Sequence, residues 1–150
     1  MKNILNEPEY KTIRQRIENL KPDAQRQWGK MDVAQMLAHC NAAIEIAAGI
    51  TPYKNESNFL TRTLLKWVIM SSVKKGSFGK NVPTSKSIKI THAVDFDKEK
   101  QQLLNNVDVF YKKGSAGSLG KHPAFGDFSN EQWGSLQGVH LDHHLSQFSA

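Results

Sequence analysis

The sequence predicts an all-α fold, an antiparallel four-helix bundle with one additional helix, formed by a single domain over residues 1–150. Apolar residues recur at helical spacing in five separate segments. No segment shows the alternation and turn of a β-hairpin, and no Rossmann-type glycine run occurs. A chain of 150 residues is also long enough to bury a substantial core. A helical bundle is the simplest architecture that covers these apolar faces.

Capping residues precede the first two predicted helices. Asn6 is followed by Glu9, and Asp32 by Gln35, at the three-residue spacing of a capping box. In such a box the two side chains satisfy backbone N–H groups that the first turn of a helix leaves unpaired. These signals set the beginnings of both helices, and Gly49 ends the second.

The third predicted helix has a wide apolar face. Leu60, Leu64 and Val68 recur at a spacing of four residues, and Gly76 ends the helix. A helix that is apolar around so much of its circumference is expected to be largely buried. Aromatic residues at helical positions are accordingly assigned to the core: Trp67, Phe110 and Trp133.

The long connection over residues 76–94 is expected to be functional or mobile, because loops of this length are uncommon in small domains. It contains Pro83 and a brief apolar alternation from Ile88 to Val94, which predicts one extended piece. His92 lies on the apolar side of that alternation and is assigned a structural role.

Clear signals also begin the last two helices. Asp95 or Asp97 caps the fourth helix, which Gly114 ends, and Ser129 with Gln132 forms the capping box of the fifth. The five predicted helices span residues 6–20, 32–46, 58–75, 95–114 and 129–148.

Cysteine content and hydropathy narrow the class of protein. The single cysteine, Cys40, excludes an internal disulfide framework and zinc sites built on CxxC pairs, as is typical of a cytoplasmic protein. Cys40 is interpreted as a small buried residue. The N-terminus lacks the apolar run of a signal peptide, and no segment is long and apolar enough to span a membrane. We therefore expect no membrane partner.

The positive charge is confined to one segment. The net charge is +6, and residues 57–94 contain seven basic residues and no acidic one. The rest of the chain has 13 basic and 14 acidic residues. This segment is either a solvated stretch or a surface for an anionic partner. Nucleic acid is disfavoured, because the chain lacks a helix-turn-helix signature and clustered arginines.

The histidines of the second and fifth helices form a candidate metal site. His140 and His144 are four residues apart, so both rings project from one helix face about 6 Å apart along the axis. His39, in mid-helix among alanines, is the candidate third ligand. Three imidazoles on a divalent ion leave a position for water or substrate, as in catalytic sites. The alternative is three histidines packed in the core.

The segments GKMDVAQMLAHCNAA and HPAFGDFSNEQWGSLQGVHLDHHLSQF resemble the DinB-like (YfiT-like) family of bacterial metal-binding four-helix-bundle proteins, in an uncharacterised branch. The resemblance spans nearly the whole chain. It implies that His39, His140 and His144 bind a divalent metal. Better-known members are thiol-dependent transferases or isomerases, others are metal-dependent hydrolases, and dimers are common. The resemblance thus implies an enzyme, a low-molecular-weight thiol as a possible cofactor, and a homodimer.

Neighbours of the candidate ligands suggest supporting roles. Zinc and nickel both suit imidazole ligands. His143 is a neighbour of the pair or a replacement for His144, and His122 is either structural or at the rim of the site. Amides on the ligand helices are candidates to orient the ligands: Gln35, Gln137 and Gln147. Because ligands must be neutral, metal affinity is expected to fall below about pH 6.5.

The function predicted from these features is metal-dependent activation of a thiol or of water against a small electrophilic substrate, as in a thiol transferase or a hydrolase. Two alternatives remain. One is a metal-binding bundle without catalysis, and the other is binding of an anionic partner such as nucleic acid through residues 57–94.

Overall fold

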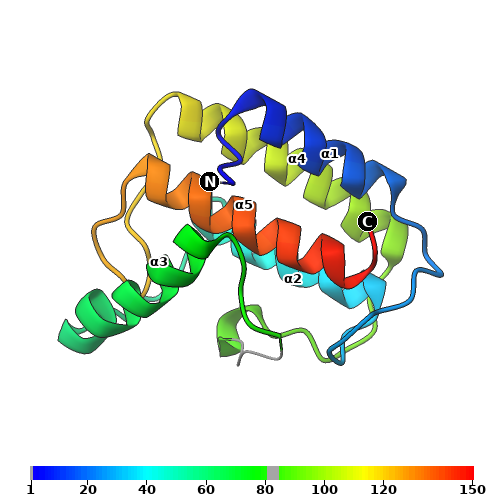
Figure 1. Ribbon diagram of the computed structural model, residues 1–150, viewed down its shortest axis with the longest axis horizontal. Coiled ribbons are helices and arrows are strands. Elements are labelled where there is room, and N and C mark those ends of the chain that lie inside the picture. The colour runs from blue at the N-terminus through cyan, green and yellow to red at the C-terminus, as the bar shows by residue number, and fades with distance from the viewer. Residues whose placement is uncertain (1, 81–84) are drawn as a thin grey trace.

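A computed structural model describes residues 2–80 and 85–150, and it confirms the all-α bundle (Figure 1). Within those residues there is no strand, only an isolated bridge between His122 and Gly126. Pro83 lies outside the described residues. The helices are α1 (Glu7–Asn19), α2 (Val33–Ala47), α3 (Lys66–Lys75), α4 (Phe96–Ser115) and α5 (Asn130–Gln147), with a π-helical turn η1 (Thr61–Leu65) and a 3-10 turn η2 (Lys86–Ile88).

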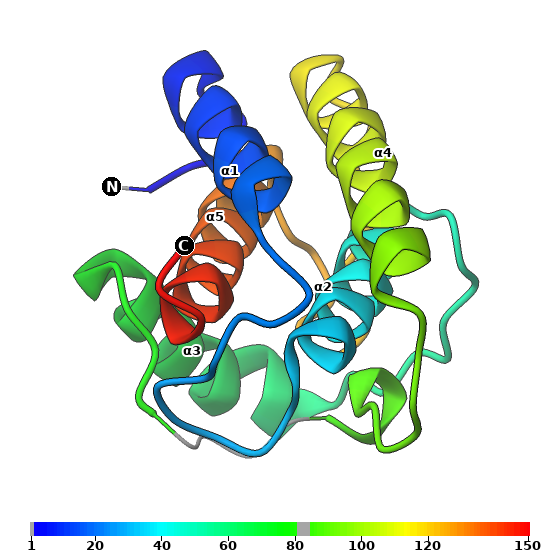
Figure 2. The same ribbon diagram turned by 90° about the vertical axis from the view of Figure 1, so that its right-hand side faces the viewer.

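Helices α1, α2, α4 and α5 form the bundle, and α3 crosses its side against α5 (Figures 1 and 2). Helices α2 and α5 run antiparallel, since the N–H of Gln27 before α2 donates to the carbonyl of Gln147 at the end of α5 at 2.8 Å. The long connection that carries α3 lets α2 and α4 run in the same direction. The Nζ of Lys113 on α4 accordingly donates to the carbonyl of Ala48 after α2 at 2.7 Å.

The core lies between the four bundle helices. Phe110 and Trp133 are buried, as predicted. Full burial of one apolar side chain contributes about 1.5 to 3 kcal/mol, so the buried apolar side chains together dominate the stability of the bundle. Its other large members are Ile13, Ile17, Met36, Leu37, Ile44, Leu103, Leu141 and Leu145.

Three of the four predicted helix caps form. Asp32 and Ser129 each complete a capping box, and the Asp95 side chain accepts the N–H of Lys98 at the start of α4. The box predicted at Asn6 is wrong, because that side chain makes no capping hydrogen bond. Helix α1 has a proline in its first turn instead, which removes one N–H that would need a partner.

The predicted burial of the third helix is wrong. Phe59 is 84% exposed and Trp67 is 68% exposed, so Trp67 is not a core residue. Only one side of α3 packs on the bundle, through Ile69, Met70 and the buried Val73. Helical periodicity identifies an apolar face, but it does not reveal whether another element covers that face.

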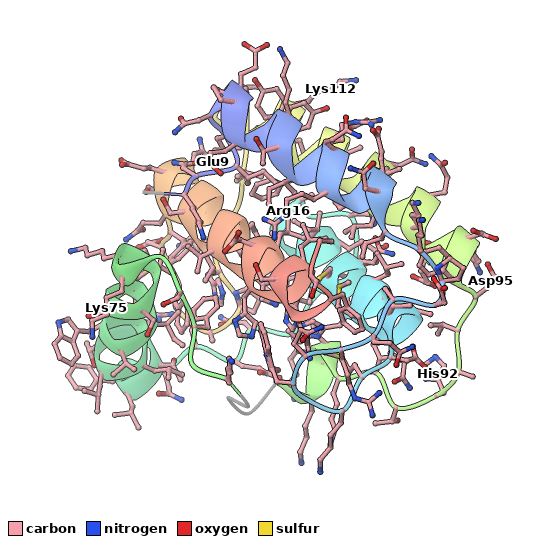
Figure 3. The ribbon with its side chains drawn as sticks, turned by 45° about the vertical axis from the view of Figure 1, so that its right-hand side comes forward. Glu9, Arg16, Lys75, His92, Asp95 and Lys112 are labelled. Atoms are coloured by element: carbon pink, nitrogen blue, oxygen red, sulfur yellow. The ribbon has the colours of Figure 1, made fainter. Side chains whose placement is uncertain are left out.

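The connection after α3 contains no extended piece in the part that the structure describes. Residues 86–88 form η2, and Ile88 and Ile90 are half-buried. His92 is exposed, which contradicts its assignment to an apolar side, and Figure 3 shows it on the connection that leads to Asp95 and α4. Among the described residues, no helix combines the length and apolar character needed to cross a bilayer.

Candidate metal centre

Helices α2 and α5 bring three histidines together inside the bundle. His39, His140 and His144 each direct a ligand atom into one cluster, and these atoms all lie within 4.8 Å of one another. The Nε2 atoms of His39 and His140 are 3.0 Å apart. Two nitrogens bound to one ion by bonds of about 2.0 to 2.1 Å lie about 2.9 to 3.4 Å apart at octahedral to tetrahedral angles. The His39–His140 pair therefore has the separation of two nitrogens on one ion, and the ligand atom of His144 lies within 4.8 Å of both.

Hydrogen bonds on the outer side of the cluster fix the rings of His39 and His144. The Nδ1 of His39 is 2.8 Å from the carbonyl oxygen of Ile88, to which it can only donate. The Nδ1 of His144 is 3.0 Å from the Oε1 of Gln147, another acceptor. With the proton on Nδ1, the Nε2 of each ring carries a bare lone pair. This is the tautomer that a metal ligand requires.

The third ring, His140, has an incomplete outer environment. Its Nε2 faces His39, but its Nδ1 is buried and has no hydrogen-bond partner among residues 2–80 and 85–150. The Oε1 of Gln137, one turn earlier on α5, is also buried and unpartnered. One group is a potential donor and the other an acceptor, so each supplies what the other lacks.

Burial keeps the cluster neutral. Desolvation lowers the pKa of His39, lowers that of His140 well below its ordinary value, and lowers that of His144 to about 3. The neighbouring histidines lower the pKa values of His140 and His144 further, because two imidazolium charges would repel. All three rings are thus neutral imidazoles at neutral pH, the form that binds a metal.

Residues of two connections, the one before α2 and the one after α3, lie around His143 at the outer edge of the cluster. The ring of His143 contacts Trp28 edge-on at 5.6 Å between centroids and Phe78 at 6.2 Å. The Lys80 ammonium lies 4.5 Å from the centre of the Trp28 ring, a cation–π contact. His143 is therefore a neighbour in this cover, while His144 is the residue that joins the cluster.

Other residues considered as ligands or partners lie elsewhere. Gln35 completes the cap of α2 and donates to the carbonyl of His92 at 3.2 Å, so it makes no hydrogen bond to the cluster. Asp142 faces the α1 side of α5, where it pairs with Lys2 and with Arg16, which Figure 3 labels. Within the described residues, no carboxylate joins the histidines.

His122 and Cys40 are also separate from the cluster. The His122 ring stacks on Phe125 and on Trp133, near the start of α5. Cys40 is buried beside Met36, and desolvation raises the pKa of its thiol strongly, as expected for a structural cysteine.

A family model described as "Protein of unknown function (DUF1569)" matches residues 2–150. The chain belongs to the DUF1569 family. No curated protein and no solved structure matches it. The match includes both helices of the cluster, so the site of this DUF1569 protein lies wholly within the matched residues.

Sequence reasoning missed the backbone groups that orient the DUF1569 cluster. The Ile88 carbonyl accepts the hydrogen bond from Nδ1 of His39. The Trp28 carbonyl accepts a hydrogen bond from Nε2 of Gln147 at 2.6 Å, so that Oε1 of the same amide faces His144. Every residue has a carbonyl, so no sequence signal distinguishes these two. Gly29 is the one sequence feature that could have indicated the close approach of the Gln147 side chain to this connection, since a Cβ at Gly29 would lie 2.4 Å from the Gln147 amide nitrogen.

Proposed function

We propose that this DUF1569 protein is a divalent-metal-dependent enzyme of the DinB-like type, with His39, His140 and His144 as the metal ligands. Zinc and nickel are the ions that suit three neutral imidazoles. The bound ion would polarise a small electrophilic substrate, or lower the pKa of a bound water or of a low-molecular-weight thiol. The reaction class is thiol transfer or hydrolysis, in a cytoplasmic setting.

One observation carries this proposal: acceptors occupy the outer nitrogens of His39 and His144 and leave two bare ring nitrogens in a cluster of three ligand atoms within 4.8 Å of one another. Without an ion, the Nε2–H of His140 can donate to the bare Nε2 of His39 at 3.0 Å, but it has no second proton for His144. A cation among the three rings would accept a lone pair from each of them.

The surroundings favour activation by the ion itself over a carboxylate base. Asp142 is bound on the far side of α5 by Lys2 and Arg16, and its pKa lies below the ordinary value because of these cations, despite partial burial. His143 is a titratable side chain outside the ligand set, in edge contact with His144 at 5.1 Å between ring centroids. It is the group placed to exchange a proton with a bound thiol or water.

A metal-binding bundle without catalysis is the second candidate, because the three ligand rings are strongly desolvated. Binding of nucleic acid through residues 57–94 is less well supported. The exposed surface of that segment is largely apolar on α3, and the side chains of Arg62 and Lys66 bond to Ser57 and Asp127 of this chain.

The first experiment is elemental analysis of untagged protein that has not met a chelator. We expect one zinc or nickel per chain in the wild type and loss of that metal in His39→Ala and in His140→Ala. His92→Ala is the matched control, because His92 is exposed and outside the cluster. Wild-type protein that contains no metal and takes none up on dialysis contradicts the site.

Activity is tested next with the metal-loaded protein. Thiol transfer to small electrophiles and hydrolysis of small esters are each measured before and after chelation. Turnover that chelation abolishes and added metal restores supports the enzyme. Stoichiometric metal with no turnover in either assay favours the non-catalytic bundle.

A further inference from the structure

The helix that begins at residue 59 and continues through η1 and α3 has an uncovered apolar surface, here called the α3 stripe. The opposite side of this helix packs on the bundle through Ile69, Met70 and Val73. Figure 1 shows that the beginning of the helix projects beyond the bundle. The α3 stripe consists of six exposed side chains: Phe59, Leu60, Leu64, Leu65, Trp67 and Val68.

The α3 stripe is a large apolar surface for a protein of this size. Its two aromatic members, Phe59 and Trp67, are 84% and 68% exposed. An aromatic side chain has an area of about 150 to 250 Å², so this pair alone exposes on the order of 300 Å². The four aliphatic members bring the total to roughly 600 Å², the upper end of the range for the largest patch of a typical monomer. A surface of this kind marks a site of contact with a partner.

The charge along the same helix is positive. Residues 56–75 contain four basic side chains and one acidic side chain, Glu56, which gives a net charge of +3. Lys74 and Lys75 are exposed at the end of α3, and Figure 3 shows Lys75 at the edge of the molecule. The partner of this helix is therefore expected to be anionic as well as apolar.

Two further cations of the helix keep their charge. The Nη2 of Arg62 donates to the hydroxyl of Ser57 at 2.8 Å, and the Nζ of Lys66 donates to the backbone carbonyl of Asp127 at 2.6 Å. Both acceptors are uncharged groups. The Asp127 carboxylate pairs with Lys121 at 2.9 Å, and that pair adds no net charge beside the helix.

We propose that the α3 stripe is a docking surface for a membrane of anionic phospholipids, with the helix over residues 59–75 lying in the plane of that membrane. The apolar side chains would enter the boundary between headgroups and acyl chains, and the lysines would lie among the lipid phosphates. Trp67 suits this boundary, because its ring is apolar and its N–H is polar. The exposed lysines favour lipid over a protein partner, since lysine is depleted in protein interfaces. The apolar stripe favours lipid over nucleic acid, whose interfaces are polar.

A helix that lies in the plane of a membrane needs neither the length nor the continuous apolar character of a spanning helix. The finding that no helix of the described residues could cross a bilayer is therefore compatible with this contact. The expectation of no membrane partner considered only segments that could span a bilayer, and the proposed contact replaces it.

Flotation of the full chain with lipid vesicles tests the docking surface. The wild type should bind vesicles of equal parts phosphatidylglycerol and phosphatidylcholine, and it should bind pure phosphatidylcholine at least about tenfold more weakly. Leu64→Gln should weaken binding to the mixed vesicles by about tenfold, because it removes apolar contact without changing the charge. Val109→Gln is the matched control, since Val109 is a 37% exposed apolar residue on α4. It should bind as the wild type does.

The charge requirement is tested separately. Lys74→Gln combined with Lys75→Gln should weaken binding by about thirtyfold, since each charge near an anionic surface contributes about fivefold. Added salt should weaken binding of the wild type as well, because it screens these charges. Lys98→Gln combined with Lys112→Gln removes the same charge from exposed positions on α4, across the bundle from α3 (Figures 1 and 2), and should have little effect.

Tryptophan fluorescence shows which helix enters the lipid. Trp67 is 68% exposed, whereas Trp133 is 2% exposed and Trp28 is half-buried. Binding to the mixed vesicles should shift the emission to shorter wavelength and allow quenching by brominated phosphatidylcholine. Trp67→Phe should lose both signals and still bind, because phenylalanine keeps an apolar ring at this position.

Three results would overturn the proposal. The first is a wild type that does not bind the mixed vesicles. The second is binding that Leu64→Gln leaves unchanged, which places the lipid contact elsewhere on the molecule. The third is a wild type that binds a DNA duplex but not the vesicles and loses the duplex in the Lys74→Gln, Lys75→Gln variant, which identifies the lysines as a nucleic-acid surface.

Discussion

Two groups of histidines in this protein are buried or half-buried, and their Nδ1 atoms play opposite roles in hydrogen bonds. In the cluster of His39, His140 and His144, the Nδ1 atoms of two rings face acceptors and leave Nε2 bare. At His122, Nδ1 accepts the backbone N–H groups of Ala124 at 3.1 Å and Phe125 at 3.2 Å. The neutral His122 ring therefore carries its proton on Nε2, and its lone pair is already engaged.

Burial alone therefore does not distinguish a metal ligand from a structural histidine. Desolvation lowers the pKa of His122 to about 4, just as it lowers the pKa of His144 to about 3. The distinction lies in where the lone pair points. The lone pair of His122 holds a turn of its own connection, whereas those of the cluster converge on one another. The predictions below test this difference.

The largest expected effect is on metal content. His39→Ala or His140→Ala should abolish stoichiometric binding, while His122→Ala should leave one metal per chain. The reason is that, in the part of the chain that the structure describes, only the cluster brings three ligand atoms within 4.8 Å of one another. Elemental analysis of the three variants purified in parallel measures this. Equal loss of metal in His122→Ala would remove the distinction between the two groups.

The next largest effect is on stability. His122→Ala should lower the free energy of unfolding by about 2 to 4 kcal/mol, because it leaves a cavity among aromatic rings. It also removes the acceptor of two backbone N–H groups. Urea denaturation of the chelated protein measures the change. A loss below about 0.5 kcal/mol, the range of a surface substitution, would contradict the structural role of His122.

Removing an amide that orients a ligand ring should have a smaller effect, a weakening of metal affinity rather than its loss. Gln147→Ala should weaken metal binding by about tenfold to a hundredfold, because His144 loses the acceptor of its Nδ1 proton. Gln137→Ala tests in the same way whether the Gln137 amide serves His140. Gln35→Ala is the control, since the Gln35 side chain caps α2. Competition with a chromogenic chelator gives the affinities, and equal values for Gln147→Ala and Gln35→Ala would contradict this role.

The smallest effect concerns pH and stability of the metal-free protein. His122 has a folded pKa of about 4 against an unfolded value of about 6.5, so the unfolded chain binds more protons between these values. Its contribution to stability is complete above about pH 6.5 and is lost as the pH falls toward 4. His122→Asn should therefore flatten the stability curve by about 1 kcal/mol between about pH 6.5 and 5.5. Urea titrations at a series of pH values measure the slope, and an unchanged slope would contradict the lowered pKa.

Burial of the ligand rings also shifts the pH at which metal binding is expected to be lost to a lower value. Neutral imidazoles that resist protonation keep their metal below about pH 6.5, the value expected for exposed histidines. We expect the metal to be retained until acid unfolds the bundle. Metal content and circular dichroism, followed together as the pH falls, should change at the same pH. Release of metal from a fully folded protein near pH 6.5 would show that the ligands titrate like free imidazole.

Local signals in the sequence were sufficient for much of the fold. Asp32, Asp95 and Ser129 begin their helices as predicted, because a cap depends on residues only three positions apart. His140 and His144 share a face for the same reason, since helical geometry fixes their relation. No local pattern contains the pairing of α2 with α5. His39 was therefore chosen from its place in mid-helix among alanines, and the resemblance to a metal-binding family supported that choice.

The sequence by itself determined the helices, the pair of histidines on α5 and the basic character of residues 57–94, because each follows from composition or short-range spacing. The tertiary structure alone decided that the carbonyls of Ile88 and Trp28 orient the ligand rings, that His122 holds a connection, and that the apolar face of α3 is uncovered. These features depend on contacts between residues far apart in the chain. Such contacts are fixed only when the helices pack, since the pattern of one segment carries no information about what lies against it.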